Sequence, residues 1–131
     1  PPMSKFRRVT SPDVAEPPPE TWSNCLVAGN TVYIAGLTAR DAGGSASGGD
    51  DEAQARGIFT KIKALVEAAG GEMTDVVKIT VYVTDIRRRE QVWKARKEFF
   101  EGNFPISTLV EVSKLADPAI TVEIDAIAIL G

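Results

Sequence analysis

The chain has 131 residues, of which 44% are hydrophobic and 25% charged, with a net charge of −3 and no histidine. This composition is ordinary for one soluble globular domain, and it excludes chemistry that depends on histidine as an acid–base group or zinc ligand. The acidic balance disfavours a nucleic-acid partner, no apolar run is long enough to cross a membrane, and Cys25 alone cannot form an internal disulfide. We therefore expect a cytoplasmic protein with one domain over residues 1–131.

The first 50 residues predict a lead-in, a hairpin and a loop. Residues 1–20 are polar and rich in proline, and predict an extended segment with one short strand around residues 6–10. Residues 22–28 and 31–35 predict a β-hairpin, because β-branched and aromatic residues flank the Gly29-Asn30 turn. Glycine and serine dominate residues 40–50, which predicts a loop whose part 43–49 is a linker or a lid.

The remaining residues predict two helices and three strands. Apolar residues recur at helical spacing from residue 51 to about 69, between an aspartate cap and Gly70-Gly71. We expect Lys61, among other charged residues, on the face of this helix opposite the apolar one. Residues 76–84 alternate as a strand, with Val77 and Ile79 on its apolar side. A second helix follows over about residues 87–101, then strands over 107–112 and 120–130.

This order of elements predicts the fold class. Two helices cannot cover both faces of a five- or six-stranded sheet, so they lie on one face and form a two-layer α+β sandwich. Residues 120–130 fit this arrangement, because one face is apolar throughout and the other carries Glu123, Ile127 and Ile129. An open sheet face that bears isoleucines favours association of identical chains.

Four stretches, in order, carry a family resemblance that covers nearly everything after residue 20. They are Trp22-Ser23-Asn24 with Val32–Gly36, Glu52–Arg56 through Gly70, Asp75–Lys78 through Asp85, and Phe104-Pro105 through Val122–Ile124. Together they resemble the Rid (reactive intermediate deaminase, or YjgF-like) family. The resemblance implies a chorismate-mutase-like fold with a mixed sheet, and a homotrimer whose small-molecule sites lie in the clefts between subunits. It also implies hydrolysis of an imine without a cofactor.

The resemblance also implies roles for individual residues. In the family, a glutamate on the last strand positions the water that attacks the imine carbon, and Glu123 stands at that position. The family arginine that holds the substrate carboxylate is replaced, because Pro105-Ile106-Ser107-Thr108 places Ser107 there. Trp22 replaces the usual tyrosine, and Trp93 falls near the usual asparagine.

The loss of the family arginine is the main departure. A guanidinium binds a carboxylate through charge-assisted hydrogen bonds worth about 1.5–3 kcal/mol each, which a serine hydroxyl cannot replace. The sequence offers two substitutes, Arg40 just after the run that borders the family cleft and Arg96 on the second helix, although both could be solvated surface residues. We predict Glu123 and Ser107 as catalytic residues, and Trp22, Thr38, Arg40, Trp93 and Arg96 as ligand contacts.

Each of these side chains also has a structural interpretation. Glu123 is either a partly desolvated carboxylate that moves a proton near neutrality or a structural carboxylate at an interface. Ser107 orients a water or merely starts a strand, and it has no histidine to activate it as a nucleophile. The two tryptophans either stack on a flat ligand or pack in a core or an interface.

Three functional hypotheses follow. The leading one is hydrolysis of a carbon–nitrogen double bond in a non-standard imine or enamine, with release of ammonia. The alternative is a trimer that binds a small metabolite without converting it, because the family arginine is missing. The third, an RNA-acting or interaction protein, rests on Arg87-Arg88-Arg89, for which neutralisation by Asp85 and Glu90 is the simpler interpretation. We predict neither a metal site nor a cofactor.

Overall fold

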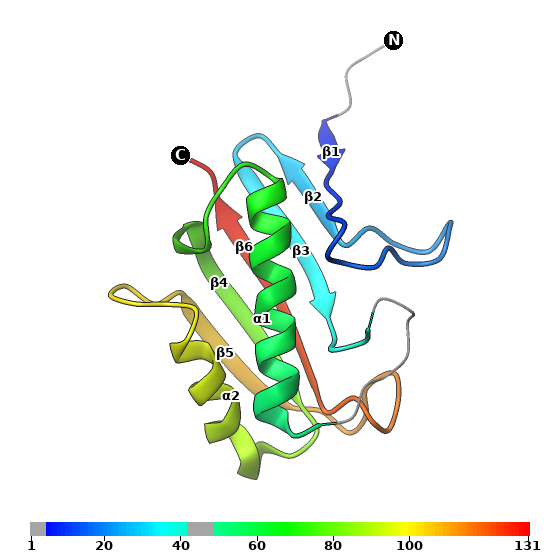
Figure 1. The fold of residues 1–131 in the computed structure, drawn as a ribbon, viewed down its shortest axis with the longest axis vertical. Helices are drawn as coiled ribbons and strands as arrows, with labels where there is room; N and C mark the ends of the chain where they lie inside the picture. The colour runs from blue at the N-terminus through cyan, green and yellow to red at the C-terminus, as the bar shows by residue number, and fades with distance from the viewer. Residues whose placement is uncertain (1–4, 42–48) are drawn as a thin grey trace.

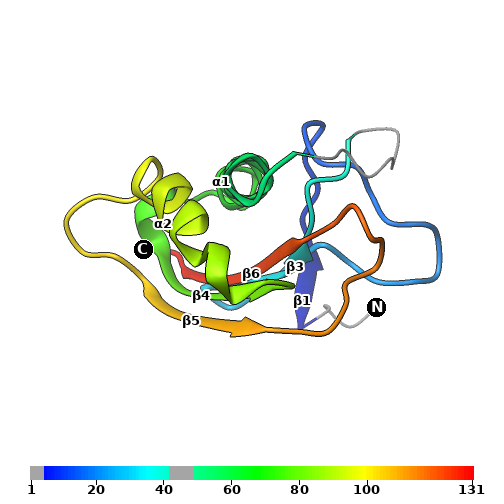
Figure 2. The ribbon, with the colours of Figure 1, turned by 90° about the horizontal axis from the view of Figure 1, so that it is seen from below.

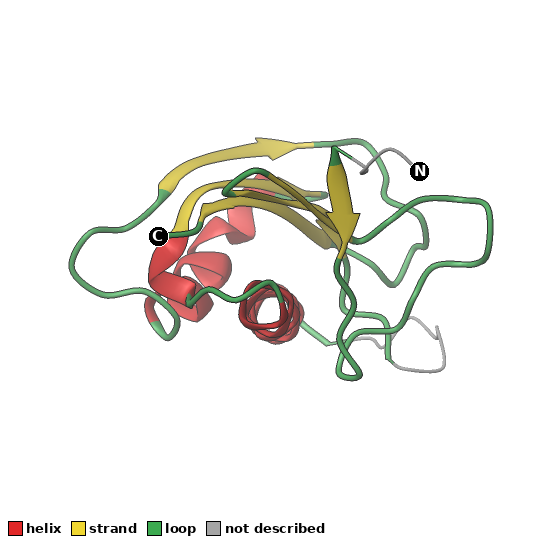
Figure 3. Ribbon diagram, turned by 90° about the horizontal axis from the view of Figure 1, so that it is seen from above, coloured by secondary structure: helices red, strands yellow, loops and turns green. Residues whose placement is uncertain are grey.

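The computed structural model describes residues 5–41 and 49–131, which form two layers (Figure 1). One layer is a six-stranded mixed sheet in the order β1-β2-β3-β6-β4-β5. Figures 2 and 3 show α1 and α2 together on one face of the sheet, with the other face open. The predicted two-layer α+β fold is therefore confirmed. The elements are β1 (Phe6–Arg8), β2 (Cys25–Ala28), β3 (Thr31–Leu37), α1 (Asp51–Ala68), β4 (Val76–Val83), α2 (Arg89–Lys97), β5 (Ile106–Glu111) and β6 (Val122–Ile129), with 3-10 turns at Met73–Asp75 and Ile86–Arg88.

The predicted hairpin joins β2 and β3, with Ala28 paired to Thr31. Gly29 in its turn has a φ of 61°, a conformation that glycine adopts without steric cost. β6 lies inside the sheet, antiparallel to both β3 and β4, and β5 runs parallel to β4 at the end of the sheet. β5 therefore presents a strand edge that has no partner in the described sheet.

α1 runs along the middle of the sheet (Figure 1), and its apolar stripe forms the centre of the core. Ile58, Phe59 and Ile62 of this stripe are fully buried. β6 alternates as predicted: its even-numbered residues from 122 to 128 are buried under the helices, whereas its odd-numbered residues are partly exposed on the open face. Glu123 therefore belongs to the open face of the sheet.

β4 contains an irregularity that the alternating pattern did not reveal. We predicted that Val77 would share the apolar face with Ile79, but Val77 is 44% exposed and Val76 is buried. The β4–β6 register shifts between Val76 and Lys78, and this extra residue reverses the alternation at the start of the strand. The prediction for Val77 was wrong, and the rest of the strand alternates as expected.

The second helix is shorter than predicted, because both of its ends are tight turns. The first two residues of the predicted span belong to the 3-10 turn Ile86–Arg88, in which the Asp85 side chain accepts a hydrogen bond from the Arg87 N–H. The helix ends at Lys97 instead of residue 101. Across residues 5–41 and 49–131, no helix combines the length and apolar composition needed to traverse a membrane.

A buried polar network joins the start of α1 to the start of β6. The Gln54 side chain donates through Nε2 to the carbonyls of Gly49 and Ala119, both at 3.0 Å, and accepts at Oε1 from the N–H groups of Thr121 (2.9 Å) and Val122 (3.3 Å). Gln54 is fully enclosed, so these bonds satisfy a polar group that would otherwise be costly to bury. The network fixes where β6 begins, one residue before Glu123.

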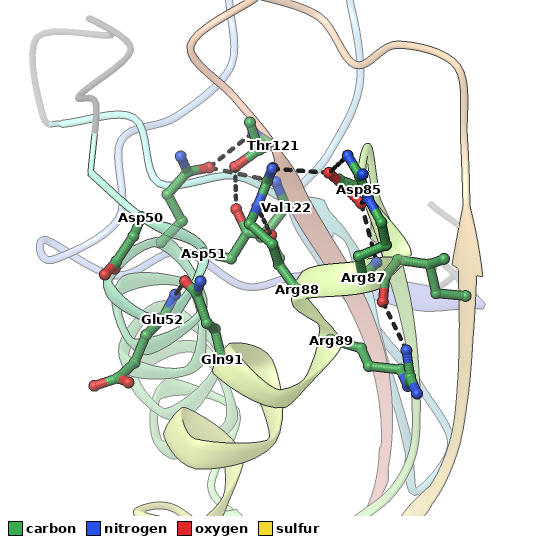
Figure 4. Close-up of polar contacts among 12 residues, drawn as sticks. Asp50, Asp51, Glu52, Asp85, Arg87, Arg88, Arg89, Gln91, Thr121 and Val122 are labelled. Carbon is green, nitrogen blue, oxygen red and sulfur yellow. Dashed lines mark hydrogen bonds and ion pairs between the residues drawn. The ribbon is translucent and has the colours of Figure 1, made fainter.

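Asp51 extends this network to α2 (Figure 4). Its carboxylate accepts a hydrogen bond from the Thr121 hydroxyl at 2.6 Å. It also forms an ion pair with Arg88, whose Nε lies 3.2 Å away. The same side chain thus holds β6, the start of α1 and the start of α2 together, which sets the distance between the helix layer and the strand that carries Glu123.

Candidate functional site

A hollow of about 500 Å³ lies where β3 ends and β6 begins. Its walls come from the proline-rich segment before β2, from the end of β3 with the residues that follow it, and from α1. Four of the seven predicted site residues line it, so the structure brings together parts of the chain that are far apart in sequence. These residues are Trp22, Thr38, Arg40 and Glu123.

Glu123 lies directly against the backbone of Gly36. The β3–β6 register shifts between Ile34 and Leu37, so that two residues of β3 oppose one of β6 at this point. A Cβ atom at residue 36 would come within 2.9 Å of the Glu123 Cδ atom, closer than real side chains approach one another. Glycine at position 36 therefore leaves the space that the Glu123 carboxylate occupies. The sequence patterns did not identify this role of Gly36.

The environment of Glu123 raises the pKa of its carboxyl group. The side chain is partly buried, and this desolvation raises the pKa of the carboxyl above its usual value, with a smaller contribution from the negative charge of Asp125 on the same face. A carboxyl of this kind exchanges its proton closer to neutrality than an exposed glutamate does. Proton transfer to or from a ligand in the hollow is therefore within its chemical capacity.

Lys61 forms part of the wall of the hollow, although its helical position predicted the opposite face. Its Nζ donates to the carbonyl oxygens of Thr38 at 2.7 Å and Arg40 at 2.6 Å. Burial lowers the pKa of Lys61, and the nearby Asp41 carboxylate partly opposes this effect. The prediction for Lys61 was wrong because its long side chain reaches back over the protein to these two carbonyls. Helical periodicity reports the face from which a side chain starts, but not where a long side chain ends. The ammonium holds residues 38–40 against α1.

The other three predicted residues, Ser107, Trp93 and Arg96, line a second hollow of about 400 Å³ between α2 and β5. Nη1 of Arg96 donates to the Ser107 hydroxyl at 3.1 Å. Ser107 thus faces the helix layer, as does Leu109 two residues further on, which packs against the core. Glu123 lies on the opposite side of the sheet, so the two predicted catalytic residues do not meet within one chain.

The two tryptophans belong to different hollows, and neither is a core residue. Trp22 is 56% exposed, and its Nε1 donates to the Asn24 side chain at 3.3 Å. Asn24 is itself buried and donates to the carbonyl of Ala15 at 3.0 Å, which ties the proline-rich segment to the hairpin. Trp93 is 37% exposed, with the Arg89 guanidinium 5.7 Å from its ring centroid. Both indoles therefore remain accessible for contact with a ligand.

Two of the three consecutive arginines at the start of α2, Arg87 and Arg88, are paired with carboxylates (Figure 4), whereas Arg89 donates to the carbonyl of Ile86. Asp85 contacts Arg87 at 2.7 Å and Arg88 at 3.1 Å, and these cations lower the pKa of Asp85 to about 2. Asp85 was predicted in this role, but the second carboxylate is Asp51 of α1 and not Glu90. The paired arginines do not present the row of unpaired cations that an RNA-binding surface needs.

Two further sequence inferences concern the surroundings of the site. Within residues 5–41 and 49–131, no group of histidine, cysteine, aspartate and glutamate side chains is arranged to hold a metal ion. The segment 43–49, predicted as a linker or lid, lies outside the described residues except for Gly49.

The fold and the first hollow define a class of protein: a small α+β sandwich with a carboxylate in a ligand-sized hollow beside its sheet. A family model described as Endoribonuclease L-PSP matches residues 14–130. The chain belongs to this family, which includes the Rid and YjgF-like proteins that the sequence resembles.

Individual relatives match over nearly their full length. A 2-iminobutanoate/2-iminopropanoate deaminase of Dermatophagoides farinae is 32% identical over 125 residues, which cover 95% of this chain and 97% of the relative. A solved protein of unknown function from Pseudomonas aeruginosa is 42% identical, with a TM-score of 0.89 and coverage of 98% and 94% of the two chains. RidA from an Antarctic Psychrobacter is 33% identical, with a TM-score of 0.84 and coverage of 95% and 100%.

Proposed function

We propose that this chain is an imine deaminase, which hydrolyses a carbon–nitrogen double bond and releases ammonia. The observation that carries the proposal is the Glu123 carboxyl, which is partly desolvated, has a raised pKa and faces a hollow of about 500 Å³. The deaminase name of the Dermatophagoides relative supports the same reaction class at 32% identity.

The reaction needs only water and one group that transfers a proton. Ionised Glu123 accepts a proton from water as the water oxygen bonds to the imine carbon, and the electron pair of the double bond moves to nitrogen. The resulting acid returns the proton to nitrogen, which gives a carbinolamine. Glu123 then takes the proton of the new hydroxyl group and passes it to the amino nitrogen, the carbonyl double bond forms as the carbon–nitrogen bond breaks, and a carbonyl compound and ammonia leave. Because Glu123 begins the cycle ionised, the reaction should slow as pH falls through its raised pKa.

A second copy of the chain supplies the wall that the Glu123 hollow lacks. The open face of the sheet carries exposed apolar side chains, including Tyr33 and Ile129, around a further hollow of about 420 Å³ that Ile127 helps to line. A sheet face of this kind favours burial against identical chains, and the family resemblance implies three of them. In such a homotrimer the α2–β5 edge of one subunit lies over the Glu123 hollow of the next, and Trp93, Arg96 and Ser107 complete it.

The substrate in this cleft is a small, flat imine. Trp22 in one hollow and Trp93 in the other present accessible indoles, whose faces suit planar and conjugated groups. The family arginine position holds Ser107, so the substrate is not bound there as the standard imines of the family are. We therefore propose that the substrate differs from the standard imines of the family by carrying an unsaturated or aromatic side chain.

The assembly is tested by Ile127→Asp, which places a charge on the open face. We expect the wild type to have the mass of three chains by light scattering at micromolar concentration, and Ile127→Asp to have the mass of one chain, because an unpaired charge is costly to bury at an interface. Lys63→Asp, on the exposed side of α1, should keep the wild-type mass. A monomeric wild type would leave the proposed cleft without its second wall.

The activity is tested on imines generated freshly from amino acids by an oxidase. We expect the purified protein to accelerate the appearance of ammonia and the carbonyl product beyond the spontaneous hydrolysis, most strongly for imines with flat side chains. A tightly bound compound that is recovered unchanged, with no acceleration for any imine, would instead favour the non-catalytic binding trimer.

A further inference from the structure

Lys61 of α1 makes two hydrogen bonds to the wall of the Glu123 hollow. Its Nζ donates to the carbonyl oxygens of Thr38 at 2.7 Å and Arg40 at 2.6 Å, which lie 23 and 21 residues away along the chain. Both acceptors follow β3, whose pairing with β6 ends at Leu37. One ammonium thus binds the chain beyond the end of this ladder.

Residues 38–40 alternate as an extended chain does. Thr38 and Arg40 line the hollow, whereas Ala39 between them packs against the hydrophobic core. Ala39 also lies over α1, because a Cβ atom at Gly57 would meet its Cβ at 3.7 Å. In an extended chain, carbonyls two residues apart point the same way, so one ammonium can bind both. The hydrogen bonds of Lys61 therefore fit the conformation that places residues 38 and 40 in the wall.

The charge of Lys61 strengthens this attachment. Lys61 is partly buried, and burial lowers the pKa of its ammonium, while Asp41 opposes the shift and Arg40 adds to it. Hydrogen bonds from a charged donor are about twice as strong as neutral ones, and surroundings of low polarity strengthen them further. Removal of the ammonium would leave two carbonyl oxygens without this donor. The position of residues 38–40 therefore depends on the charged form of Lys61.

The position of Glu123 has separate supports. Its carboxylate lies in the space that Gly36 leaves within the β3–β6 pair. The start of β6 is held by Gln54, which accepts from the N–H groups of residues 121 and 122. A change at Lys61 can therefore loosen the wall of the hollow and leave the carboxyl group that transfers the proton in place.

We propose that Lys61 is a positioning residue for substrate binding, which holds Thr38 and Arg40 in the wall of the hollow and does not itself react. This inference rests on the proposed function and deepens it, because it concerns how the substrate of that reaction is bound. Without the ammonium the wall moves and the substrate binds more weakly. Proton transfer by Glu123 continues in each complex that forms.

The test is steady-state hydrolysis of the imine that an oxidase generates from phenylalanine, which has a flat side chain. Lys61→Met keeps a long side chain but removes both hydrogen bonds, and we expect KM to rise about 10-fold and kcat to change less than about threefold. Lys61→Arg keeps the charge and the donors, and should restore most of the wild-type KM. Lys63→Met, the same change on the exposed side of α1, is the matched control and should leave both constants unchanged.

The pH dependence of KM separates the charge of residue 61 from its bulk. Above its lowered pKa, Lys61 is a neutral amine whose hydrogen bonds to the two carbonyls are weaker. The wild-type KM should therefore rise with pH, starting below the value of about 10.4 of an ordinary lysine. Lys61→Arg stays charged and should remove this rise. The other charged groups of the hollow, Arg40, Asp41, Glu16 and Glu123, are present in both proteins, so the difference between the profiles reports residue 61.

Hydrogen exchange of the amides of residues 37–41 tests the positioning without turnover. Exchange in Lys61→Met should be about 10-fold faster than in the wild type and in Lys63→Met, because the segment opens more easily. Lys61→Arg should exchange as the wild type does. A higher KM with unchanged exchange would mean that the ammonium contacts the substrate directly. Faster exchange with unchanged KM would mean that it only stabilises the fold, and either result overturns the proposal.

The two proposals fail in different measurements. A wild type that releases no ammonia from any imine would contradict the deaminase function, whereas faster exchange in Lys61→Met and its rescue in Lys61→Arg would still assign the wall to Lys61. A wild type that releases ammonia, with the same KM in Lys61→Met, would keep the function and remove the role of Lys61.

Discussion

Glu123→Gln is expected to reduce ammonia release by about 10²- to 10⁴-fold, the usual contribution of a positioned acid–base group. Glutamine has nearly the same shape as glutamate, so the hollow and the contact with Gly36 should persist while the proton acceptor is lost. Steady-state assays on one imine, with the spontaneous rate subtracted, measure the effect. Retention of the wild-type rate would show that Glu123 is a structural carboxylate.

The pH dependence of the wild type should agree with this assignment. Because burial raises the pKa of Glu123 in the folded state, kcat/KM should fall on the acid side at a pH above the usual range of a glutamate. Asp125→Asn removes the neighbouring negative charge that contributes to the shift, so the acid limb of the profile should move to lower pH. An acid limb that does not respond to Asp125→Asn would place the titrating group elsewhere.

Glu123→Gln should also stabilise the protein. A carboxyl whose pKa is higher in the folded than in the unfolded state makes folding less favourable when it is ionised, and this penalty disappears as pH falls through the raised value. The free energy of unfolding of Glu123→Gln should therefore exceed that of the wild type at pH 7 and match it at low pH, where glutamate is neutral in both states. Urea titrations at the two pH values make the comparison.

Gly36→Ala is expected to lower ammonia release about 100-fold without unfolding the protein, because a displacement of about 1 Å in a catalytic group can cost that much. The added Cβ would meet the Glu123 carboxyl at 2.9 Å from Cδ, and this end of a flexible side chain can move away while the strands stay in place. The base would therefore remain ionisable but be misplaced. Activity assays, together with circular dichroism as a measure of folding, test this prediction.

Gly57→Ala provides the matched control for Gly36→Ala. A Cβ at residue 57 would meet the nearest atom, the Cβ of Ala39, at an ordinary 3.7 Å. Because position 57 lies inside α1, alanine should also raise stability by about 1 kcal/mol. Full activity in Gly36→Ala, or an equal loss of activity in both variants, would contradict the proposed role of Gly36.

The fold could be predicted because its main elements have strong local signals. The apolar stripe of α1, the Gly29-Asn30 turn and the alternation of β6 each report their structure within a few residues of sequence. Val77 could not be placed correctly, because the register shift beside it depends on how β4 pairs with β6. Lys61 was missed for a similar reason, since its carbonyl partners at Thr38 and Arg40 follow β3, more than twenty residues away.

The residues and contacts of the candidate site were harder to predict from the sequence than the fold was. Glu123, Trp22 and Ser107 were identified through a family resemblance, whereas no periodicity or spacing singles them out. The close approach of Gly36 to Glu123 depends on an irregularity between two strands that are distant in sequence. The hydrogen bond from Arg96 to Ser107 depends on how α2 packs over β5. Both features are properties of three-dimensional contacts, so a single sequence without the fold does not contain a direct signal for them.

Glu123 and Arg96 lie on opposite sides of the sheet and on separate elements, and this separation bears on how the protein can diverge. Substitutions in α2 and β5 can alter the second hollow while β6, the strand that carries Glu123, remains intact. In the proposed homotrimer, one such change would be repeated at each boundary between subunits. The lining of the α2–β5 hollow can therefore change in sequence without altering the contact between Gly36 and Glu123.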